Sequence, residues 1–170
     1  MMNRRKLLKT GAGLLLSAMT IPAALRAATA GEFIKERHSG NVEKVVMSEI
    51  EWQKKLTEAQ YYILREEGTE PPYSSVLNDE KREGIYFCAG CEQALFTSKM
   101  KFDSGTGWPS FFESIEGAFE TKTDFKLIYP RKEYHCSRCD GHHGHIFKDG
   151  PAPTGKRWCN NGAALKFRPA

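Results

Sequence analysis

The sequence lacks the features that mark membrane-spanning, fibrous and repeat proteins. No apolar run reaches the roughly 18–20 residues that a membrane-spanning helix needs, and no internal repeat or low-complexity tract follows residue 30. The apolar and charged fractions of 40% and 27% are ordinary, which argues against a disordered or fibrous chain. A chain of 170 residues is long enough for one domain with a hydrophobic core.

Acidic side chains are absent from residues 1–30, although this segment holds five of the 25 basic ones. Because all 21 acidic residues lie beyond it, residues 31–170 carry 20 basic side chains and a net charge of −1. The net charge of +4 for the whole chain therefore comes from the first 30 residues. The rest has no electrostatic footprint for nucleic acid, so we expect no nucleic-acid partner.

Residues 1–30 have the three parts of a bacterial export signal. A basic start and a short apolar run lead to a small-x-small triplet at residues 28–30. The adjacent Arg4 and Arg5, followed by two leucines and a lysine, resemble the twin-arginine form of this signal. A secretory signal with a chance Arg-Arg pair, or an uncleaved anchor, is the alternative. We expect cleavage after Ala30, export to the periplasm and no membrane contact by the mature chain.

Two short helices are predicted after a mixed lead-in. Ser48 and Thr57 each begin a capping box, in which Ser or Thr is followed three residues later by Glu or Gln. The pattern predicts helices at about 48–55 and 58–67, with Gly68 as the C-terminal stop. Their buried face would consist of three apolar residues: Trp52, Leu56 and Ile63.

From residue 84 the sequence consists of short, aromatic-rich and partly alternating segments, separated by Gly and Pro. Nothing has the spacing of a β-α-β unit. We therefore predict a mainly β (α+β) domain of antiparallel strands behind the two helices, filling residues 48–170 after a lead-in at 31–47. Strands are expected at 85–88, 119–122, 125–129, 145–147 and 165–167. Phe125, Leu127 and Tyr129 would share one face of their strand.

Four of the five cysteines fall into two Cys-x-x-Cys pairs: Cys88 with Cys91, and Cys136 with Cys139. Two residues between thiolates let one turn of chain present both sulfurs to a single metal ion. Two such turns complete a tetrahedral Cys₄ site, the preferred geometry of structural zinc. The doubled pattern predicts one structural Zn²⁺ that clamps two distant strands together.

Two alternatives fit the same pairs. Disulfides are plausible in an oxidising compartment, but a thioredoxin-like pair would begin a helix, and Gly90 and the strand-like flanks argue against that. A zinc ribbon that binds nucleic acid usually has its pairs about 15–20 residues apart. Here 44 residues separate Cys91 from Cys136.

Cys159 is left without a partner once the other four cysteines are paired. Arg157 lies two residues away, and a nearby cation and amide donors favour the reactive thiolate. The alternative is a buried and inert cysteine, which is the commoner fate of a lone cysteine. A free cysteine is less expected in an exported protein, which weakens that alternative.

Three histidines, His142, His143 and His145, follow the second cysteine pair. Imidazole can donate a proton near neutral pH, as a leaving oxygen requires. Metal ligation and a plain surface position are the alternatives, and ligation is the weaker because four cysteines already fill a zinc site. Trp108 lies on a glycine-containing loop, and its spacing alone favours a core position over a pocket.

Two ordered stretches, Gly107–Phe111 and Gly144–Asn161, together with the two cysteine pairs, resemble the B-type methionine sulfoxide reductases. The match runs from about Ser48 to Phe167. Several long motifs in the same order make this resemblance specific. It implies two antiparallel sheets that form a small β domain with a Cys₄ zinc clamp, and the two short helices predicted above would precede them.

The resemblance also implies an activity, the reduction of methionine-R-sulfoxide in oxidised proteins, and hence their repair. In this reaction a thiolate attacks the sulfoxide sulfur, an acid protonates the oxygen, and a sulfenic acid remains on the cysteine. The matching positions imply Cys159 as nucleophile, Arg157 as its support, Asn161 as a pocket residue, His142 and His145 as active-site histidines with His145 the proton donor, Trp108 as the aromatic that holds the methyl group, and Cys88, Cys91, Cys136 and Cys139 as zinc ligands.

Thr106 departs from the pattern of many relatives, which carry a second, recycling cysteine at this position. Cys159 then has no internal partner, so we expect an external thiol, either a thioredoxin-like protein or a small thiol, to reduce the sulfenic acid. We expect the enzyme to be a monomer. Two other functions stay open: a zinc-stabilised binding module, which has no need of Cys159, and a thiol–disulfide oxidoreductase, which a zinc assay on the cysteine pairs distinguishes.

Overall fold

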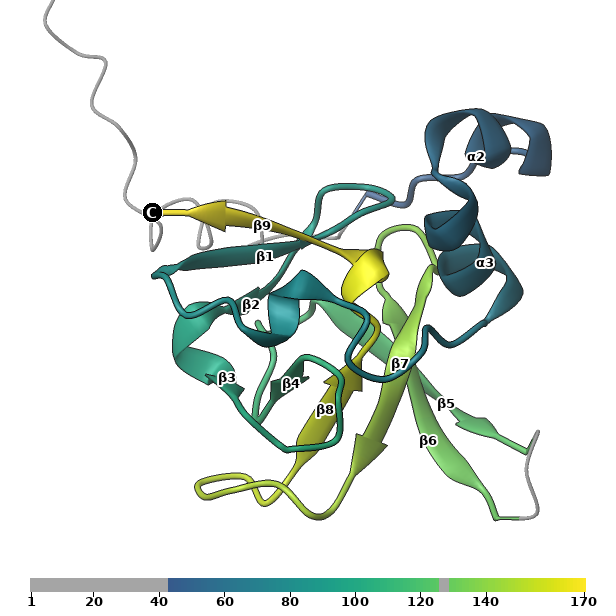
Figure 1. Ribbon diagram of the computed structural model, residues 1–170. Helices are drawn as coiled ribbons and strands as arrows, with labels where there is room; N and C mark the ends of the chain where they lie inside the picture. The colour runs from purple at the N-terminus through teal and green to yellow at the C-terminus, as the bar shows by residue number, and fades with distance from the viewer. Residues whose placement is uncertain (1–42, 126–128) are drawn as a thin grey trace, which may run out of the picture.

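In the computed structural model, which describes residues 43–125 and 129–170, two short helices precede an antiparallel β structure (Figure 1). The predicted export signal and residues 31–42 of the predicted lead-in lie outside the described residues. Within the described part, no helix has the length and apolar character needed to cross a membrane. The elements are α2 (Glu49–Lys55), α3 (Glu58–Glu66), η1 (Val76–Asn78), β1 (Gly84–Cys88), β2 (Ala94–Thr97), η2 (Ser98–Met100), β3 (Lys101–Phe102), β4 (Ser110–Phe111), β5 (Phe119–Asp124), β6 (Arg131–Cys136), β7 (His142–Phe147), β8 (Arg157–Asn160), η3 (Gly162–Ala164) and β9 (Leu165–Pro169).

Both helices begin at the predicted capping boxes. The Glu51 carboxylate accepts the Ser48 backbone N–H at 2.8 Å, and the Ser48 hydroxyl accepts the Glu51 N–H. Thr57 and Gln60 form the same reciprocal pair. Each box satisfies backbone donors that the first turn of a helix otherwise leaves unpaired. The predicted apolar face is buried: Trp52, Leu56 and Ile63.

α3 ends just before Gly68, the predicted C-terminal stop, but Gly68 is not the residue with left-handed backbone geometry. Glu67 is the residue with left-handed backbone geometry, φ 55°, while the Gly68 N–H donates to the Tyr62 carbonyl. A Cβ at position 68 would lie 2.3 Å from the Tyr62 ring, so a larger residue there would require this exposed side chain to shift.

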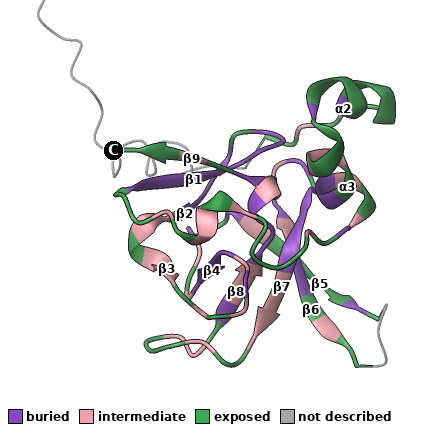
Figure 2. Cartoon of the chain, viewed as in Figure 1, coloured by how far each residue is buried: buried purple, intermediate pink, exposed green. Residues whose placement is uncertain are grey.

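Two antiparallel sheets form the β structure, as predicted. One has the order β2-β1-β9 and the other β3-β4-β8-β7-β6-β5. Aromatic side chains from both sheets meet in the core. Phe96 of the first sheet stacks on Phe111 of the second with ring centroids 3.9 Å apart, and Tyr86 packs edge-on against the same Phe111 ring. Figure 2 shows buried residues along β1 and in the upper part of β7, against which α3 packs.

The strand predicted at 125–129 is wrong at both ends. Phe125 and Tyr129 lie outside any strand and are 76% and 80% exposed, while residues 126–128 lie outside the described part. The ladder between β5 and β6 ends before this segment, which therefore joins the two strands of a hairpin. An apolar alternation predicts a strand only where a sheet face covers it.

Strand β8 has no counterpart among the expected strands, because the sequence Arg-Trp-Cys-Asn does not alternate between apolar and polar residues. Pairing on both sides holds it in the second sheet. Its neighbours are β4, where Ser110 is the register partner of Cys159, and β7, where His145 is the register partner of the same cysteine. The fold thus places Cys159 in the interior of the larger sheet, between a serine and a histidine.

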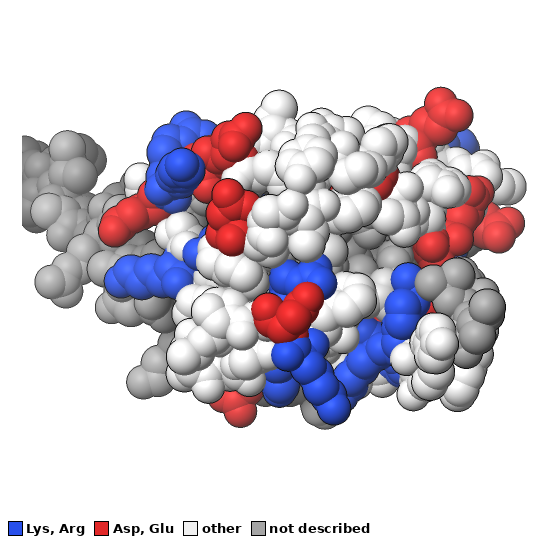
Figure 3. All heavy atoms as spheres, turned by 60° about the horizontal axis from the view of Figure 1, so that its bottom comes forward, with Lys and Arg blue, Asp and Glu red and all other residues white. Residues whose placement is uncertain are grey.

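Charged side chains of both signs cover the outside. On the face drawn in Figure 3, groups of Lys and Arg lie next to groups of Asp and Glu. Several of these charges form exposed ion pairs, such as Arg168 with Glu92 and Lys122 with Glu67. Exposed pairs of this kind contribute little to stability, typically about 0–1 kcal/mol.

Candidate active site

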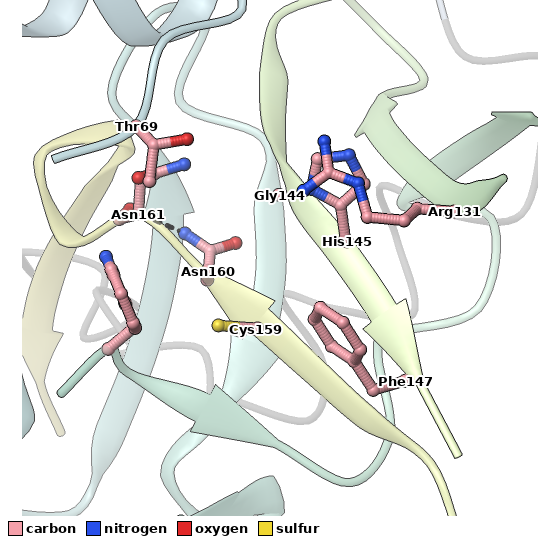
Figure 4. Close-up of a pocket in the computed structure, with 9 residues that line it drawn as sticks. Thr69, Arg131, Gly144, His145, Phe147, Cys159, Asn160 and Asn161 are labelled. Atoms are coloured by element: carbon pink, nitrogen blue, oxygen red, sulfur yellow. Dashed lines mark hydrogen bonds between the residues drawn. The ribbon is translucent and has the colours of Figure 1, made fainter. Parts of the chain in front are cut away.

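Cys159 lies in a pocket where β7, β8, the loop before β4 and the segment after α3 meet. Figure 4 shows its sulfur with Thr69 and Asn161 on one side and His145, Arg131 and Phe147 on the other. The pocket is lined by Thr69, Trp108, Arg131, Gly144, His145, Phe147, Cys159, Asn160 and Asn161. Four residues singled out in the sequence therefore line one pocket: Trp108, His145, Cys159 and Asn161.

Gly144 allows the two strands of the pocket to approach each other at the nucleophile. A Cβ at this position would lie 1.9 Å from the Cys159 carbonyl oxygen, and φ is +157°. No other residue type fits between these backbones without moving β7 away from β8.

The Cys159 thiol is half-buried, and burial raises its pKa above the ordinary value of 9.0. The Arg157 guanidinium and the Thr106 hydroxyl act in the opposite direction. Arg157 is buried and fixed, because it donates two hydrogen bonds of 2.9 Å to Asp149 and lies 4.3 Å from the centre of the Phe147 ring. The charge of Arg157 favours the thiolate, but the larger effect is the burial of the thiol, which opposes it.

Alkylation of Cys159 should therefore accelerate with pH throughout the neutral range. Because the pKa lies above 9.0, the thiol predominates at pH 7, and the thiolate fraction should grow about tenfold per pH unit until the pKa is reached. Iodoacetamide labelling of Cys159 between pH 6 and 9, followed by mass spectrometry, measures this. Thr106→Val removes a hydroxyl that lowers the pKa of Cys159, so this variant should be labelled more slowly than the wild type at each pH in this range. A rate that levels off below pH 7 would contradict the expectation.

His145 is fixed by carboxylate contacts at the pocket wall. Its Nε2 lies 2.8 Å from Asp124 Oδ2, and Arg131 Nη2 donates to the same oxygen at 2.7 Å. Burial lowers the pKa of His145 below 6.5, against the opposing effect of Asp124, so the ring is neutral at pH 7. With Nε2 bound to a carboxylate, Nδ1 is the ring atom left to exchange a proton.

His142 and His143 lie behind the pocket. His142 is buried, with Nδ1 2.7 Å from Glu133 Oε1, and its ring centre is 5.5 Å from that of His145. His143 is fully buried, packs edge-on against Phe119, and has a pKa lowered to about 3 by burial. The structure thus separates the three adjacent histidines into one on the pocket wall and two behind it.

Asn161 and Trp108 are tied to the segment after α3 by one residue, Glu70. The Asn161 carboxamide accepts the Glu70 N–H at 3.0 Å and donates to the His143 carbonyl at 3.0 Å. The Trp108 indole N–H donates to the Glu70 carbonyl at 3.0 Å. Trp108 is half-buried on the pocket wall, although its spacing alone favoured the core.

Thr106 belongs to a chain of hydroxyl groups beside the nucleophile. Ser104 Oγ lies 2.8 Å from both Thr106 Oγ1 and Ser110 Oγ, and Ser110 is the register partner of Cys159. A hydrogen bond from the Thr106 hydroxyl is one of the effects that lower the pKa of Cys159. The threonine therefore lies where a second cysteine could reach the nucleophile.

Sequence reasoning missed several polar residues of the site. Asp124 and Glu133, the carboxylates that hold His145 and His142, come from strands whose polar residues are expected to face solvent. No short sequence pattern marks Arg131, Asp149 or Glu70 as residues of the site either. Strand pairing brings the carboxylates close to their histidines, since β5 with Asp124 pairs with β6 with Glu133, and β6 pairs with β7, which carries both histidines.

The four remaining cysteines form one buried cluster whose sulfurs all lie within 4.8 Å of one another: Cys88, Cys91, Cys136 and Cys139. The distance between sulfurs is 3.7 Å for Cys88 and Cys139 and 3.5 Å for Cys91 and Cys136. A disulfide bond would require about 2.05 Å. Tetrahedral coordination at about 2.3 Å per bond separates sulfurs by about 3.8 Å. The four residues therefore fit a structural metal ion.

Cys88 ends β1 of the smaller sheet and Cys136 ends β6 of the larger one, so the cluster joins the two sheets. Arg138 links the two cysteine turns by donating to the Cys91 carbonyl at 2.9 Å, and Arg65 of α3 donates to the Cys139 carbonyl at 2.8 Å. The cysteine cluster is thus part of the framework that carries the pocket, and it lies apart from the residues that line the pocket.

A half-buried thiol beside a histidine–carboxylate pair is the site of a thiol-dependent enzyme, and the Cys₄ cluster of its β fold fits a structural metal ion. Comparison with known proteins gives the particular family. Residues 56–169 match the SelR domain. The chain is 51% identical over 125 residues to the peptide methionine sulfoxide reductase MsrB of Methanosarcina barkeri, covering 73% of this chain and 88% of that protein.

Two further relatives are also named methionine sulfoxide reductases of the B type. The mitochondrial methionine-R-sulfoxide reductase B2 of Rattus norvegicus is 47% identical over 135 residues, which cover 75% of this chain and 78% of the rat protein. The peptide methionine sulfoxide reductase MsrB of Bradyrhizobium diazoefficiens is 47% identical over 128 residues, which cover 75% and 92%. The chain belongs to the SelR/MsrB family of methionine sulfoxide reductases.

Proposed function

We infer that this chain reduces methionine-R-sulfoxide in proteins to methionine with electrons from a thiol, and so repairs oxidised proteins. The observation that carries this function is the pocket around Cys159 in a chain of the SelR/MsrB family. The R epimer follows from the relatives' function, since the rat relative is named a methionine-R-sulfoxide reductase.

Each group of the pocket fits one part of the reaction. The Cys159 sulfur attacks the sulfoxide sulfur, and the substrate oxygen takes up a proton and passes to Cys159, which leaves methionine and a sulfenic acid. His145 Nδ1 accepts the thiol proton and delivers it to the oxygen, while Asp124 stabilises the imidazolium formed in between. Trp108 contacts the substrate methyl group, and Arg157 stabilises the developing thiolate.

An assay with the two epimers of a peptide methionine sulfoxide tests the function. With dithiothreitol as reductant, the R epimer should be reduced and the S epimer left unchanged. Turnover of the S epimer alone, or of neither, would refute the inferred activity. A binding module would hold the R epimer without producing methionine, and this assay distinguishes the two functions.

We propose that the sulfenic acid on Cys159 is reduced by two external thiols. The first forms a mixed disulfide with Cys159 and releases water, and the second displaces it and restores the Cys159 thiol. The position of Thr106 supports this route, because a hydroxyl cannot replace a resolving cysteine. The reductant is either a thioredoxin-like protein or a small thiol, and the enzyme acts as a monomer.

Thr106→Cys should give Cys159 an internal partner. After one turnover without reductant, this variant should contain a disulfide between the introduced cysteine and Cys159, while the wild-type chain should keep a sulfenic acid that dimedone traps. Thr106→Ser is the matched control, because it keeps a hydroxyl and should behave like the wild type. Thiol titration and mass spectrometry measure both products. An intramolecular disulfide of Cys159 in the wild-type chain, with its metal still bound, would contradict the external-thiol route.

We propose that the ion of the Cys₄ cluster is zinc, one per chain, because four thiolates in tetrahedral arrangement are its preferred structural ligands. The ion would supply a structural tie between the sheets. We further propose that residues 1–30 are a twin-arginine-like signal that sends the protein folded to the periplasm, after zinc has been loaded in the reducing cytoplasm. Full zinc content after export by a secretory-route signal would refute this coupling.

A further inference from the structure

Glu70 lies between α3 and η1 and contacts both walls of the Cys159 pocket. We propose that Glu70 is a positioning residue that fixes the Trp108 wall relative to Cys159, and thereby sets the size of the alkyl group on sulfur that the pocket accepts. This proposal rests on the inferred sulfoxide reductase activity. It assigns substrate selectivity to a carboxylate that does not line the pocket.

The side chain of Glu70 binds the residues that directly follow β8, the strand that carries Cys159. Its two carboxylate oxygens accept the backbone N–H groups of Gly162 at 2.5 Å and Ala163 at 2.9 Å. Its own backbone N–H donates to the Asn161 side chain at 3.0 Å. Three hydrogen bonds therefore hold Glu70 against residues 161–163, which begin two positions after Cys159.

The carbonyl of Glu70 holds the opposite wall. It accepts the Trp108 indole N–H at 3.0 Å, which fixes the ring by its only polar atom. Glu70 thus links the indole of Trp108 to the residues that follow β8, and so fixes the position of the ring relative to that strand. Moving Glu70 would move the acceptor and release the ring to another orientation.

The residues that follow Glu70 also bind the loop before Trp108. The Tyr73 N–H donates to the Gly107 carbonyl at 2.7 Å, and the Tyr73 hydroxyl donates to the Gly105 carbonyl at 2.8 Å. Gly107 has φ +90°, and a Cβ there would lie 2.8 Å from Pro72. The segment after Glu70 and the loop before Trp108 therefore form one packed unit, and the Glu70 carboxylate attaches this unit to the nucleophile strand.

This attachment matters because the pocket must distinguish small apolar groups. One extra methylene changes the binding of a transition state in an apolar site by about 10–200-fold. A Trp108 ring held in one position can exclude the extra methylene, whereas a ring that can move leaves room for it. The wild-type protein should therefore prefer a methyl sulfoxide to its ethyl homologue, and loss of the Glu70 carboxylate should weaken that preference.

The experiment compares methionine-R-sulfoxide and ethionine-R-sulfoxide, both as N-acetylated amides, in Glu70→Ala, Glu70→Gln and the wild-type protein. In Glu70→Ala, KM for the methyl substrate should rise about tenfold with a smaller change in kcat, and the ratio of kcat/KM values should fall toward one. Glu70→Gln keeps one acceptor oxygen and should fall between the two. Glu66→Ala, an exposed glutamate of α3, is the matched control and should behave like the wild type.

Three outcomes decide the proposal. Unchanged selectivity in a folded, metal-containing Glu70→Ala protein would overturn it. If that variant does not fold, Glu70→Gln gives the decision: wild-type selectivity there would also overturn the proposal, and reduced selectivity would support it. If the wild-type protein reduces neither sulfoxide, the inferred activity fails instead, and the two failures are therefore distinguishable.

Discussion

Cys159→Ser should abolish the reduction of methionine-R-sulfoxide, lowering kcat/KM by a factor on the order of 10³ or more. Serine keeps the size of the side chain but removes the only atom of the pocket that can accept the substrate oxygen as a sulfenic acid. Sulfur is also a far stronger nucleophile than a hydroxyl oxygen near neutral pH. The neighbouring groups, His145 with Asp124 and Arg157 with Asp149, remain in place and cannot replace it.

A stereospecific assay of both proteins, with metal content and melting temperature measured in parallel, checks this result. The Cys159→Ser protein should bind the same amount of metal and melt at nearly the same temperature, because Cys159 lies outside the metal cluster. Equal activity in the two proteins would end the assignment of Cys159 as the nucleophile. Loss of activity together with loss of metal would show that the substitution acts through the fold.

Cys136→Ser should have the opposite pattern, with loss of metal and a large loss of stability. Cys136 ends β6 and its cluster partner Cys88 ends β1, so an ion held by the four cysteines would tie the larger sheet to the smaller one. Structural zinc sites contribute several kcal/mol to folding, and for a domain of this size such a loss lowers the melting temperature by about 10 °C or more. A strong chelator should have the same effect on the wild-type protein.

Thermal unfolding by circular dichroism and metal analysis by atomic absorption measure this expectation. Cys159→Ser is the matched control, since it is the same exchange at a cysteine outside the cluster. A metal-free wild-type protein with an unchanged melting temperature would refute a structural role for the ion. Detection of disulfides within the Cys-x-x-Cys pairs would instead restore the alternative that the sequence left open.

Much of this fold could be predicted from the sequence because its signals are local. A capping box needs only residues three positions apart, so Ser48 and Thr57 mark both helix starts. A Cys-x-x-Cys pair likewise needs one turn of chain, and its doubling predicts the metal cluster. The strand predicted at 125–129 was wrong at its two described ends, Phe125 and Tyr129, because alternation does not show whether a neighbouring strand is present.

The four-cysteine cluster and the separation of Cys159 from it were determined by the sequence itself, because counting and short spacing suffice to find them. The tertiary structure alone decided which groups surround Cys159. Asp124 and His145 lie 21 positions apart, and Glu70 and Trp108 lie 38 apart. The register between β5, β6 and β7 makes the first of these contacts, and the packing of the segment after α3 on the loop before β4 makes the second. Such contacts depend on many residues at once, so no short stretch of sequence encodes them.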